Sequence, residues 1–350
     1  MEPNYLFSEV REINDEFLTR KRDSGFLSNA YYSIGYDKKG ERVAGCGTFL
    51  SFAHEIEDGV INPDGKLVLA NFCKDRLCPM CMWRRSLKIF SQISEVMNVC
   101  GNNYRYLFLT LTIPNCCGSD LRKTIQNLYN ATIRMFRKKR FNFIRGIIRT
   151  LECTYNLEHD NWHPHLHLIL AVDGSYFGRD YMRQDEWQRY WYESYYKLPF
   201  NPTAVTKPLL IVDIRKVKSK DGIDFGSAVA EISKYSVKPD NFLYSDELLT
   251  QSIVQVLTEQ MHGLRMFSLS GCFKDAFNEL QLQDVESSDI DLIHINSNWN
   301  TNLEHILYNF HWKCGFYVMS EPDFLPVNSP RPGDNYKSKS KKGALKNGKT

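Results

Sequence analysis

The stretch that decides the fold reads His163-Pro164-His165-Leu166-His167-Leu168-Ile169-Leu170. Its alternating polar and apolar side chains are typical of a β-strand, in which residues two apart point to the same face. His165 and His167 therefore project together. Two neighbouring imidazoles are natural metal ligands that leave coordination positions open for a substrate oxygen. The alternative is a pair of half-buried histidines that are hydrogen-bonded within a sheet.

A second strand precedes this one and offers a third ligand. Residues 144–155 and 165–172 are rich in β-forming side chains, and the polar turn Glu158-His159-Asp160-Asn161 separates them, which predicts a hairpin. Glu152 lies on the first strand of this hairpin, and we expect it to complete a metal site with His165 and His167. The sequence alone does not determine which face of the strand Glu152 occupies.

A tyrosine and a glutamate lie one turn apart in a predicted helix over residues 225–237, within Glu231-Ile232-Ser233-Lys234-Tyr235-Ser236-Val237-Lys238. At positions i and i+4, Glu231 and Tyr235 share a helix face. A tyrosine beside lysines and a cation that polarises a phosphate can attack phosphorus. A carboxylate one turn away can act as the base for water. The alternative is that both are ordinary surface or packing residues.

Four of the ten cysteines have the spacing of a metal site. Cys78 and Cys81 form a C-x2-C knuckle, and Cys73 and Cys46 lie upstream of it. Four thiolates suit tetrahedral zinc, so these residues predict a structural zinc site. The same spacing also permits a redox dithiol or a set of buried free thiols.

The net charge of +3 conceals a basic region. Residues 121–150 contain nine Lys or Arg and no acidic residue, and we expect a long helix at about 121–139. Such a surface suits DNA phosphates, although a solvated helix face has the same composition. The candidate DNA-binding residues are Arg134, Arg137, Lys138, Lys139 and Arg140, together with Lys234, Tyr235 and Lys238.

Aromatic side chains gather in the predicted helix over residues 183–197. They could stack single-stranded bases, but their near-helical spacing is more typical of core packing. They are Trp187, Tyr190, Trp191, Tyr192, Tyr195 and Tyr196.

Composition and patterning place the chain among globular proteins. No apolar run approaches the length of a membrane-spanning helix, and the first residues lack a signal-peptide pattern, so we expect a cytoplasmic protein with no membrane partner. Predicted strands mix with helices without a regular βαβ period. This mixture favours an α+β fold with a mostly antiparallel sheet.

Taken in order, three motifs resemble those of the rolling-circle replication initiators of the HUH endonuclease superfamily. They are Phe108-Leu109-Thr110-Leu111-Thr112-Ile113-Pro114-Asn115, then His163-Pro164-His165-Leu166-His167, then Glu231 to Lys238. The segment Arg76-Leu77-Cys78-Pro79-Met80-Cys81-Met82-Trp83-Arg84-Arg85 is similar to initiators of small Gram-positive-type plasmids, of the single-tyrosine subgroup. The resemblance covers roughly residues 46–272.

This resemblance implies an HUH-endonuclease fold, with a central five-stranded, mostly antiparallel sheet flanked by helices and a small Cys-rich zinc-binding element. It implies Mg²⁺ or Mn²⁺ on His165 and His167. Tyr235 would nick the plasmid double-strand origin, cut as single strand, giving a 5′-phosphotyrosyl link and a 3′-OH primer. Glu231 would activate water at termination. A host helicase and a host polymerase are the partners implied.

We divide the chain into five segments on this basis. Residues 1–45 are an unassigned N-terminal arm, 46–100 the Cys-rich element with a helix, and 101–272 the nickase domain. An acidic segment at 273–327 and a disordered Lys-rich tail at 328–350 follow. Two other functions stay open at this point: a zinc-containing DNA-binding regulator without catalysis, and an HUH transposase or mobilisation relaxase.

Overall fold

The computed structural model describes residues 13–217, 226–234, 237–295 and 299–333. The chain forms two compact units. One unit comprises Met1–Arg84 with Asp291–Thr350, and the other comprises Arg85–Ile290. No helix among the described residues is long and apolar enough to cross a membrane.

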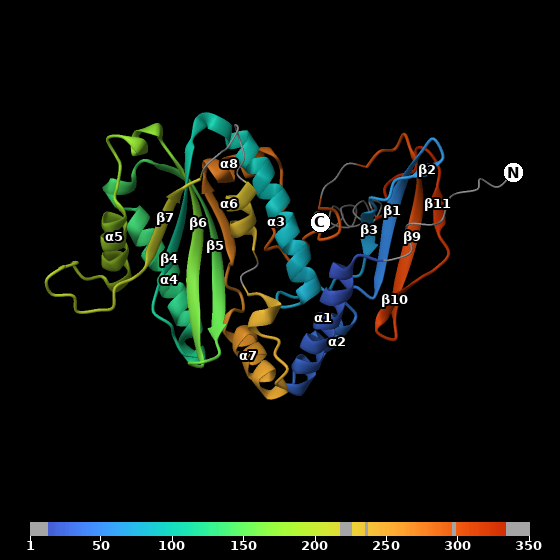
Figure 1. Cartoon of the computed structure of the whole chain (residues 1–350), viewed down its shortest axis with the longest axis horizontal. Helices are drawn as coiled ribbons and strands as arrows, with labels where there is room; N and C mark the ends of the chain where they lie inside the picture. Colours follow the sequence, from blue (N-terminus) through green and yellow to red (C-terminus); the bar gives the residue numbers. More distant parts are fainter. Residues whose placement is uncertain (1–12, 218–225, 235–236, 296–298, 334–350) are drawn as a thin grey trace, which may run out of the picture. The chain divides into compact units, whose positions relative to one another are not determined.

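The Arg85–Ile290 unit is built on a five-stranded antiparallel sheet (Figure 1). Its spatial order is β7-β4-β6-β5-β8. The two long central strands, β5 and β6, form the hairpin that the sequence predicts. The strands are β4 (Arg105–Thr112), β5 (Ile144–Asn156), β6 (Asn161–Val172), β7 (Val212–Lys216) and β8 (Phe267–Gly271).

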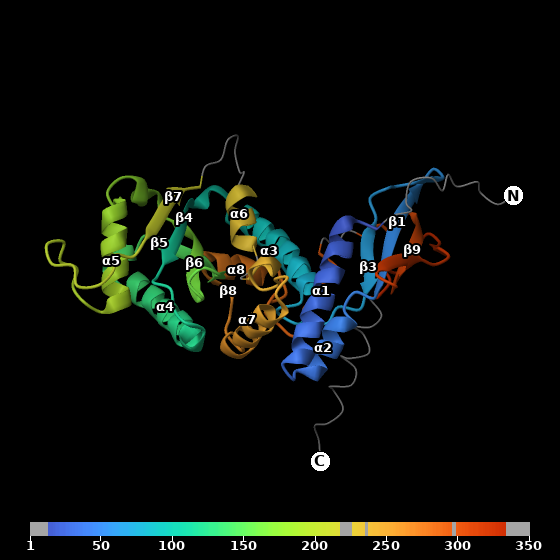
Figure 2. The same ribbon diagram turned by 60° about the horizontal axis from the view of Figure 1, so that its bottom comes forward.

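Helices cover both faces of this sheet (Figures 1 and 2). One face carries α4 (Leu121–Phe136) and α5 (Gln184–Tyr196), and the other carries α3 (Pro79–Cys100), α6 (Gly226–Ser233) and α8 (Cys272–Glu279). The predicted α+β architecture with an antiparallel sheet is therefore confirmed. The remaining helical elements are α7 (Glu247–Gln260), η1 (Gly101–Asn103), η2 (Gly118–Asp120), η3 (Lys139–Phe141), η4 (Gly174–Phe177) and η5 (Pro239–Asn241).

The alternation of β6 sorts its side chains between the two helical layers. Leu168 is fully buried and lines a cavity with Ile133 and Phe136 of α4, so the leucines of β6 face α4. His165 and His167 consequently face the opposite side. On α5, Trp187 and Trp191 are fully buried, which assigns these two rings to the core rather than to base stacking.

The other unit joins the two ends of the described chain in one sheet. Strand β1 (Phe49–Glu57) pairs with β9 (Glu304–Lys313) in antiparallel register from Phe49↔His311 to Ile56↔Glu304. The sheet also contains β2 (Val60–Ile61), β3 (Lys66–Ala70), β10 (Phe316–Met319) and β11 (Asp323–Leu325). Residues 46–100 and 273–327, which are separate segments in the predicted division, thus contribute strands to one sheet. The functional division into five segments stays a prediction.

Two helices precede β1 where the sequence analysis assigned no structure. They are α1 (Asp15–Ser33), which begins at an Asn14 cap, and α2 (Asp37–Ala44). The Asn14 side chain accepts a hydrogen bond from the Glu16 backbone N–H at 2.8 Å, satisfying a donor that the first helical turn leaves open. Buried side chains of α1, including Phe17 and Leu27, hold it against the rest of its unit. The tail residues 334–350 and the first twelve residues lie outside the described part of the chain.

Candidate functional site

A carboxylate and two imidazoles meet on one face of the β5–β6 hairpin. In the strand register Glu152 lies opposite His165, which settles the face that the sequence left open. Glu152 Oε2 is 2.9 Å from His167 Nε2 and 3.4 Å from His165 Nε2. Ligand atoms of all three residues lie within 4.8 Å of one another. The structure therefore brings together the three predicted metal ligands.

The other ring nitrogen of each histidine also has a partner. His165 Nδ1–H donates to the carbonyl oxygen of His163 at 3.3 Å, and His167 Nδ1 is 3.1 Å from Thr110 Oγ1 on the adjacent strand β4. Partners of this kind orient the two imidazole rings so that both Nε2 atoms face Glu152. Thr110 was not predicted as a site residue, although it lies in the first of the three motifs.

The surroundings of Glu152 keep it ionised. Burial would raise the pKa of this carboxyl group, but hydrogen bonds from His165 and His167 and the nearby charge of Lys238 hold its pKa well below the ordinary value. Lys238 Nζ lies 3.3 Å from Glu152 Oε1. A buried anionic oxygen beside two Nε2 atoms fits a divalent cation, because a carboxylate and two imidazoles form a common ligand set with open positions.

Helix α6 is attached to the same face of the sheet. Thr150, which lies opposite His167 in the register, donates its hydroxyl hydrogen to the carbonyl oxygen of Ile232 at 2.8 Å. Glu231 lies on this helix and forms an ion pair with Lys234. Tyr235 lies outside the described residues. The described neighbours on either side of it, Lys234 and Lys238, make contacts with Glu231 and Glu152 respectively.

The predicted basic surface lies on the opposite face of the sheet, at the end of α4. Arg134 Nε donates to the carbonyl oxygen of Ser194, and Lys138 forms an ion pair with Glu193 at 2.8 Å. Arg140 donates to the carbonyl oxygen of Tyr181 at 2.9 Å. These three side chains therefore hold α4 against α5 and the loop before it. Arg137 and Lys139 are exposed. The structure does not bring this group to the histidine cluster.

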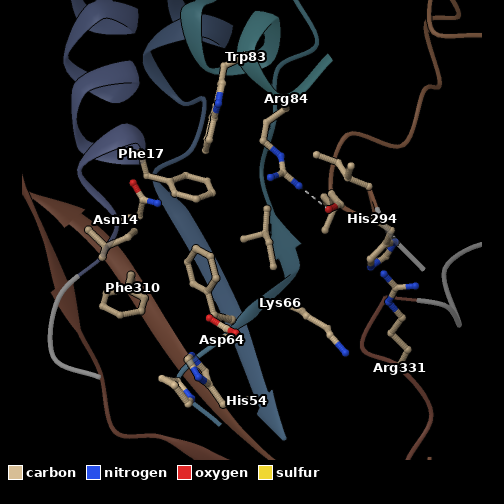
Figure 3. Close-up of a pocket in the computed structure, with 17 residues that line it drawn as sticks. Asn14, Phe17, His54, Asp64, Lys66, Trp83, Arg84, His294, Phe310 and Arg331 are labelled. Atoms are coloured by element: carbon tan, nitrogen blue, oxygen red, sulfur yellow. Dashed lines mark hydrogen bonds between the residues drawn. The ribbon is translucent and has the colours of Figure 1, made fainter. Parts of the chain in front are cut away.

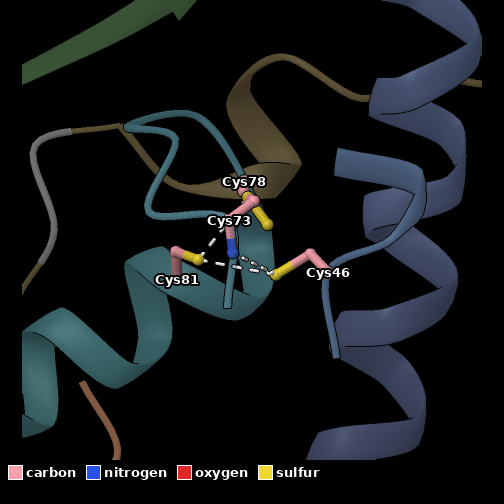
Figure 4. Close-up of side chains that lie close together, drawn as sticks. All are labelled: Cys46, Cys73, Cys78 and Cys81. Carbon is pink, nitrogen blue, oxygen red and sulfur yellow. Dashed lines mark hydrogen bonds between the residues drawn. The ribbon is translucent and has the colours of Figure 1, made fainter. Parts of the chain in front are cut away.

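Four thiols form a second cluster, in the unit that contains β1 (Figure 4). Cys46 follows α2, Cys73 follows β3, and Cys78 and Cys81 lie at the start of α3. Cys81 Sγ is 3.5 Å from Cys46 Sγ and 3.7 Å from Cys73 Sγ. All four sulfur atoms lie within 4.8 Å of one another. The predicted grouping of these cysteines is therefore confirmed as a possible metal site.

The sulfur positions fit a tetrahedral ion. Zinc–sulfur bonds of about 2.3 Å place the sulfur atoms of a tetrahedron about 3.8 Å apart. Backbone N–H groups also point at the sulfurs: Lys74 donates to Cys81 Sγ at 3.1 Å, and Cys73 donates to Cys46 Sγ at 3.4 Å. Such donors stabilise thiolates, which are the metal-binding form of cysteine.

Comparisons with known proteins agree with this arrangement. A family model described as "Replication protein" matches residues 64–318. A "Protein rep" of a Bacillus species is 35% identical over 273 residues, covering 73% of this chain and 85% of that protein. A "Protein rep" of Streptococcus pneumoniae serotype 2 is 36% identical over 280 residues, covering 77% and 81%.

A third relative extends the match along the chain. A "Protein rep" of Lentilactobacillus hilgardii is 33% identical over 299 residues, covering 82% of this chain and 90% of that protein. No solved structure matches the chain significantly. Because these matches cover most of the chain, it belongs to the replication protein family and is a rolling-circle replication initiator.

Proposed function

We propose that this initiator is a site-specific nickase and strand transferase with an HUH-endonuclease fold, and that it acts on its plasmid's double-strand origin. The observation that carries the proposal is the cluster of Glu152, His165 and His167, beside which α6 is attached through Thr150. A protein with this role works on plasmid DNA in the cytoplasm.

Tyr235 is the proposed nucleophile. Its phenol loses a proton, and its oxygen attacks the phosphorus of the origin strand. The bond from phosphorus to the 3′ oxygen breaks, and that oxygen takes up a proton. The products are a 5′-phosphotyrosyl link and a 3′-OH that primes the host polymerase while a host helicase opens the duplex. Lys234 and Lys238, on either side of Tyr235 in sequence, suit contacts with the phosphate anion.

Glu152, His165 and His167 are the proposed ligands of Mg²⁺ or Mn²⁺. When bound, the ion polarises the phosphate and stabilises charge on its oxygens. Thr110 and the His163 carbonyl orient the two imidazoles so that both Nε2 atoms face Glu152. Lys238 neutralises part of the charge on Glu152.

Glu231 is the proposed base at termination. It takes a proton from water as the water oxygen attacks phosphorus and the bond from phosphorus to the 3′ oxygen breaks. This final cleavage leaves a free 5′-phosphate and a 3′-OH instead of a second protein link. Its ion pair places the Lys234 ammonium group beside the carboxylate. The variant Glu231→Ala is expected to nick but to release no terminated product, and unaltered termination would refute this role.

Cys46, Cys73, Cys78 and Cys81 are the proposed ligands of a structural zinc ion. Four buried or half-buried thiols with no open ligand position fit a structural site better than a catalytic one. The cluster links the turn after α2 to the start of α3. DNA contacts of the exposed Arg137 and Lys139, and of Arg134, Lys138 and Arg140, are proposed as a separate backbone-binding surface.

The decisive experiment is a covalent adduct assay. The full-length protein is incubated with an origin-containing single-stranded oligonucleotide and Mn²⁺, and denaturing gels detect the protein–DNA link. We expect an adduct that disappears in Tyr235→Phe and persists in the neighbouring control Tyr244→Phe. An equal adduct yield with Tyr235→Phe would refute the assignment. No adduct with any variant would favour a DNA-binding regulator without catalysis.

A further inference from the structure

A cavity of about 520 Å³ lies within the unit that contains β1, and none of its lining residues belongs to either ligand cluster (Figure 3). Its volume falls within the range of about 300–1,000 Å³ that small-molecule sites occupy. Residues of α1, β1, β3, α3 and β9 line it, together with the segments around residues 63–65, 293–295 and 331. The nickase chemistry proposed above uses none of these residues.

Aromatic rings form one side of the cavity. Phe17 packs edge-on against Trp83 and Phe52, with ring centroids 4.8 and 5.3 Å apart, and Phe52 packs against Phe310 at 5.9 Å. Trp83 and Phe52 are only half-buried, so part of their surface faces the cavity. Rings in this arrangement present apolar, polarisable surface that suits a planar aromatic ligand.

A buried arginine lies beside these rings (Figure 3), with its Cζ 5.6 Å from the ring centroid of Trp83 and 5.9 Å from that of Phe17. Arg84 is 7% exposed, and its Nε and Nη2 groups donate to the carbonyl oxygens of Leu292 and Ile293 at 2.9 and 2.6 Å. Both acceptors are neutral. Within the described part of the chain, no carboxylate forms an ion pair with this guanidinium. A buried cation without a contacting anion is unfavourable, and burial lowers the pKa of Arg84 to about 10.

The charge of the Asp291 carboxylate acts on Arg84 and raises its pKa, which only partly offsets the effect of burial. Lys66 bonds to Glu55 at 2.8 Å, so its charge is already paired. Arg331 adds a second guanidinium, and Asp64 places one carboxylate at the turn before β3. His54 Nδ1–H donates to the carbonyl oxygen of Asn62 at 2.8 Å. The cavity therefore offers aromatic rings with a cationic donor, Arg84, directly beside them.

We propose that this cavity binds one nucleoside monophosphate unit, with its base against the Phe17, Phe52 and Trp83 rings and its phosphate on Arg84. Stacking of a base and a charge-assisted bond to a phosphate are the two interactions that such a lining provides. This nucleotide is either an unstacked nucleotide within single-stranded DNA or a free nucleotide. The DNA source rests on the proposed function, whereas the free-nucleotide source does not.

Two probes test the proposal on the full-length protein, without added Mg²⁺ or Mn²⁺ so that cleavage does not intervene. The first is a single-stranded thymine oligonucleotide with one 5-iodouracil, which is photo-crosslinked and mapped by mass spectrometry. The second is free dTMP, titrated by calorimetry. We expect crosslinks at Phe17, Phe52 or Trp83 from the DNA source, or saturable dTMP binding from the free source.

Two variants of cavity residues and one control variant test whether the crosslinking or the dTMP binding takes place in the cavity. Arg84→Gln removes the charge and keeps a donor for one carbonyl, and Phe52→Leu removes a ring and keeps an apolar side chain. Each is expected to weaken the observed binding at least tenfold. Lys313 is an exposed cation of the same unit outside the cavity. The control variant Lys313→Gln should therefore keep the binding affinity within twofold of that of the parent protein. Thermal melting monitored by circular dichroism confirms that each variant is folded.

The possible outcomes distinguish single-stranded DNA from a free nucleotide as the ligand, and two of them would overturn the proposal. Crosslinks at the cavity rings that dTMP does not displace assign the site to DNA. Calorimetric dTMP binding that both variants weaken assigns it to a free nucleotide. Absence of both signals in the folded parent protein overturns the proposal, as does equal binding by a folded Phe52→Leu variant. Neither result bears on nicking by Tyr235, because no measurement requires cleavage.

Discussion

Glu152 contacts both imidazoles of the cluster through one oxygen, with Oε2 2.9 Å from His167 Nε2 and 3.4 Å from His165 Nε2. A protein that used these histidines only for packing would not need a buried carboxylate opposite them. A cation bound in place of the hydrogen bonds between Glu152 and the two imidazoles would be stabilised by the negative charge of Glu152. Replacement of this residue is therefore the test that distinguishes a metal site from a hydrogen-bonded pair of sheet histidines.

Replacing Glu152 by glutamine is expected to lower Mn²⁺ affinity more than tenfold. The amide keeps the size of the side chain but removes the negative oxygen, and even outer-sphere changes cost about 10–100-fold in affinity. Titration followed by electron paramagnetic resonance measures the effect. Glu158→Gln, in the exposed turn of the same hairpin, is the matched control. Equal Mn²⁺ affinity of the two variants would place the metal elsewhere.

Thr110→Val tests the support of the imidazole rings. Valine matches the shape of threonine but removes the hydroxyl that lies 3.1 Å from His167 Nδ1. We expect Mn²⁺ affinity to fall about tenfold, as is usual for a lost hydrogen bond to a ligating histidine. The control is Thr154→Val on β5, which pairs with His163 instead of a ligand. An affinity within twofold of the parent protein would show that Thr110 does not orient the ring.

At the scale of elements, secondary structure that depends on neighbouring residues could be predicted from the sequence, whereas pairing between strands far apart in the chain could not. The β5–β6 hairpin, α4 and the grouping of Cys78 with Cys81 depend on neighbouring residues, and all were predicted. One partner of β1 is β9, about 250 residues later, and no local pattern specifies such a pairing. The helix of residues 15–33 was missed because its polar and apolar residues show little helical periodicity, and that of residues 37–44 because it is short and contains Gly40. Thr110 was missed because a threonine in a strand has no metal-site signature.

The junction of β8 and α8 provides an element-scale prediction. Gly271 has φ +57°, and a Cβ there would lie 2.0 Å from the carbonyl oxygen of Arg145 on the paired strand. Gly271→Ala is expected to lower the free energy of unfolding by about 3 kcal/mol or more, because backbone strain of about 1–3 kcal/mol is added to this clash. Urea denaturation measures the change.

Gly263→Ala is the matched control for this junction. Gly263 also has positive φ, +70°, but nothing lies within 4 Å of its Cβ position. The left-handed conformation alone costs about 1–2 kcal/mol. If Gly271→Ala were no more destabilising than Gly263→Ala, the close approach of Gly271 to Arg145 would not constrain the sheet edge.

At the scale of the whole molecule, the two ligand clusters belong to different units. The four cysteines lie in the unit of Met1–Arg84 with Asp291–Thr350, and the Glu152 cluster lies in the unit of Arg85–Ile290. The two clusters also share no ligand. Metal loss at one cluster should therefore leave the other intact, although α3 runs through both units.

Cys78→Ser tests this independence. Its thiol is fully buried within the four-cysteine cluster, so we expect zinc content to fall from about one ion per chain to near zero, with a lower thermal unfolding temperature. Mn²⁺ affinity of the Glu152 cluster should stay within twofold. Elemental analysis and Mn²⁺ titration of the same preparation measure both values, with the exposed Cys314→Ser as control. A parallel loss of Mn²⁺ binding would mean that the zinc-bound unit supports the catalytic sheet, whereas unchanged zinc content would remove Cys78 from the ligand set.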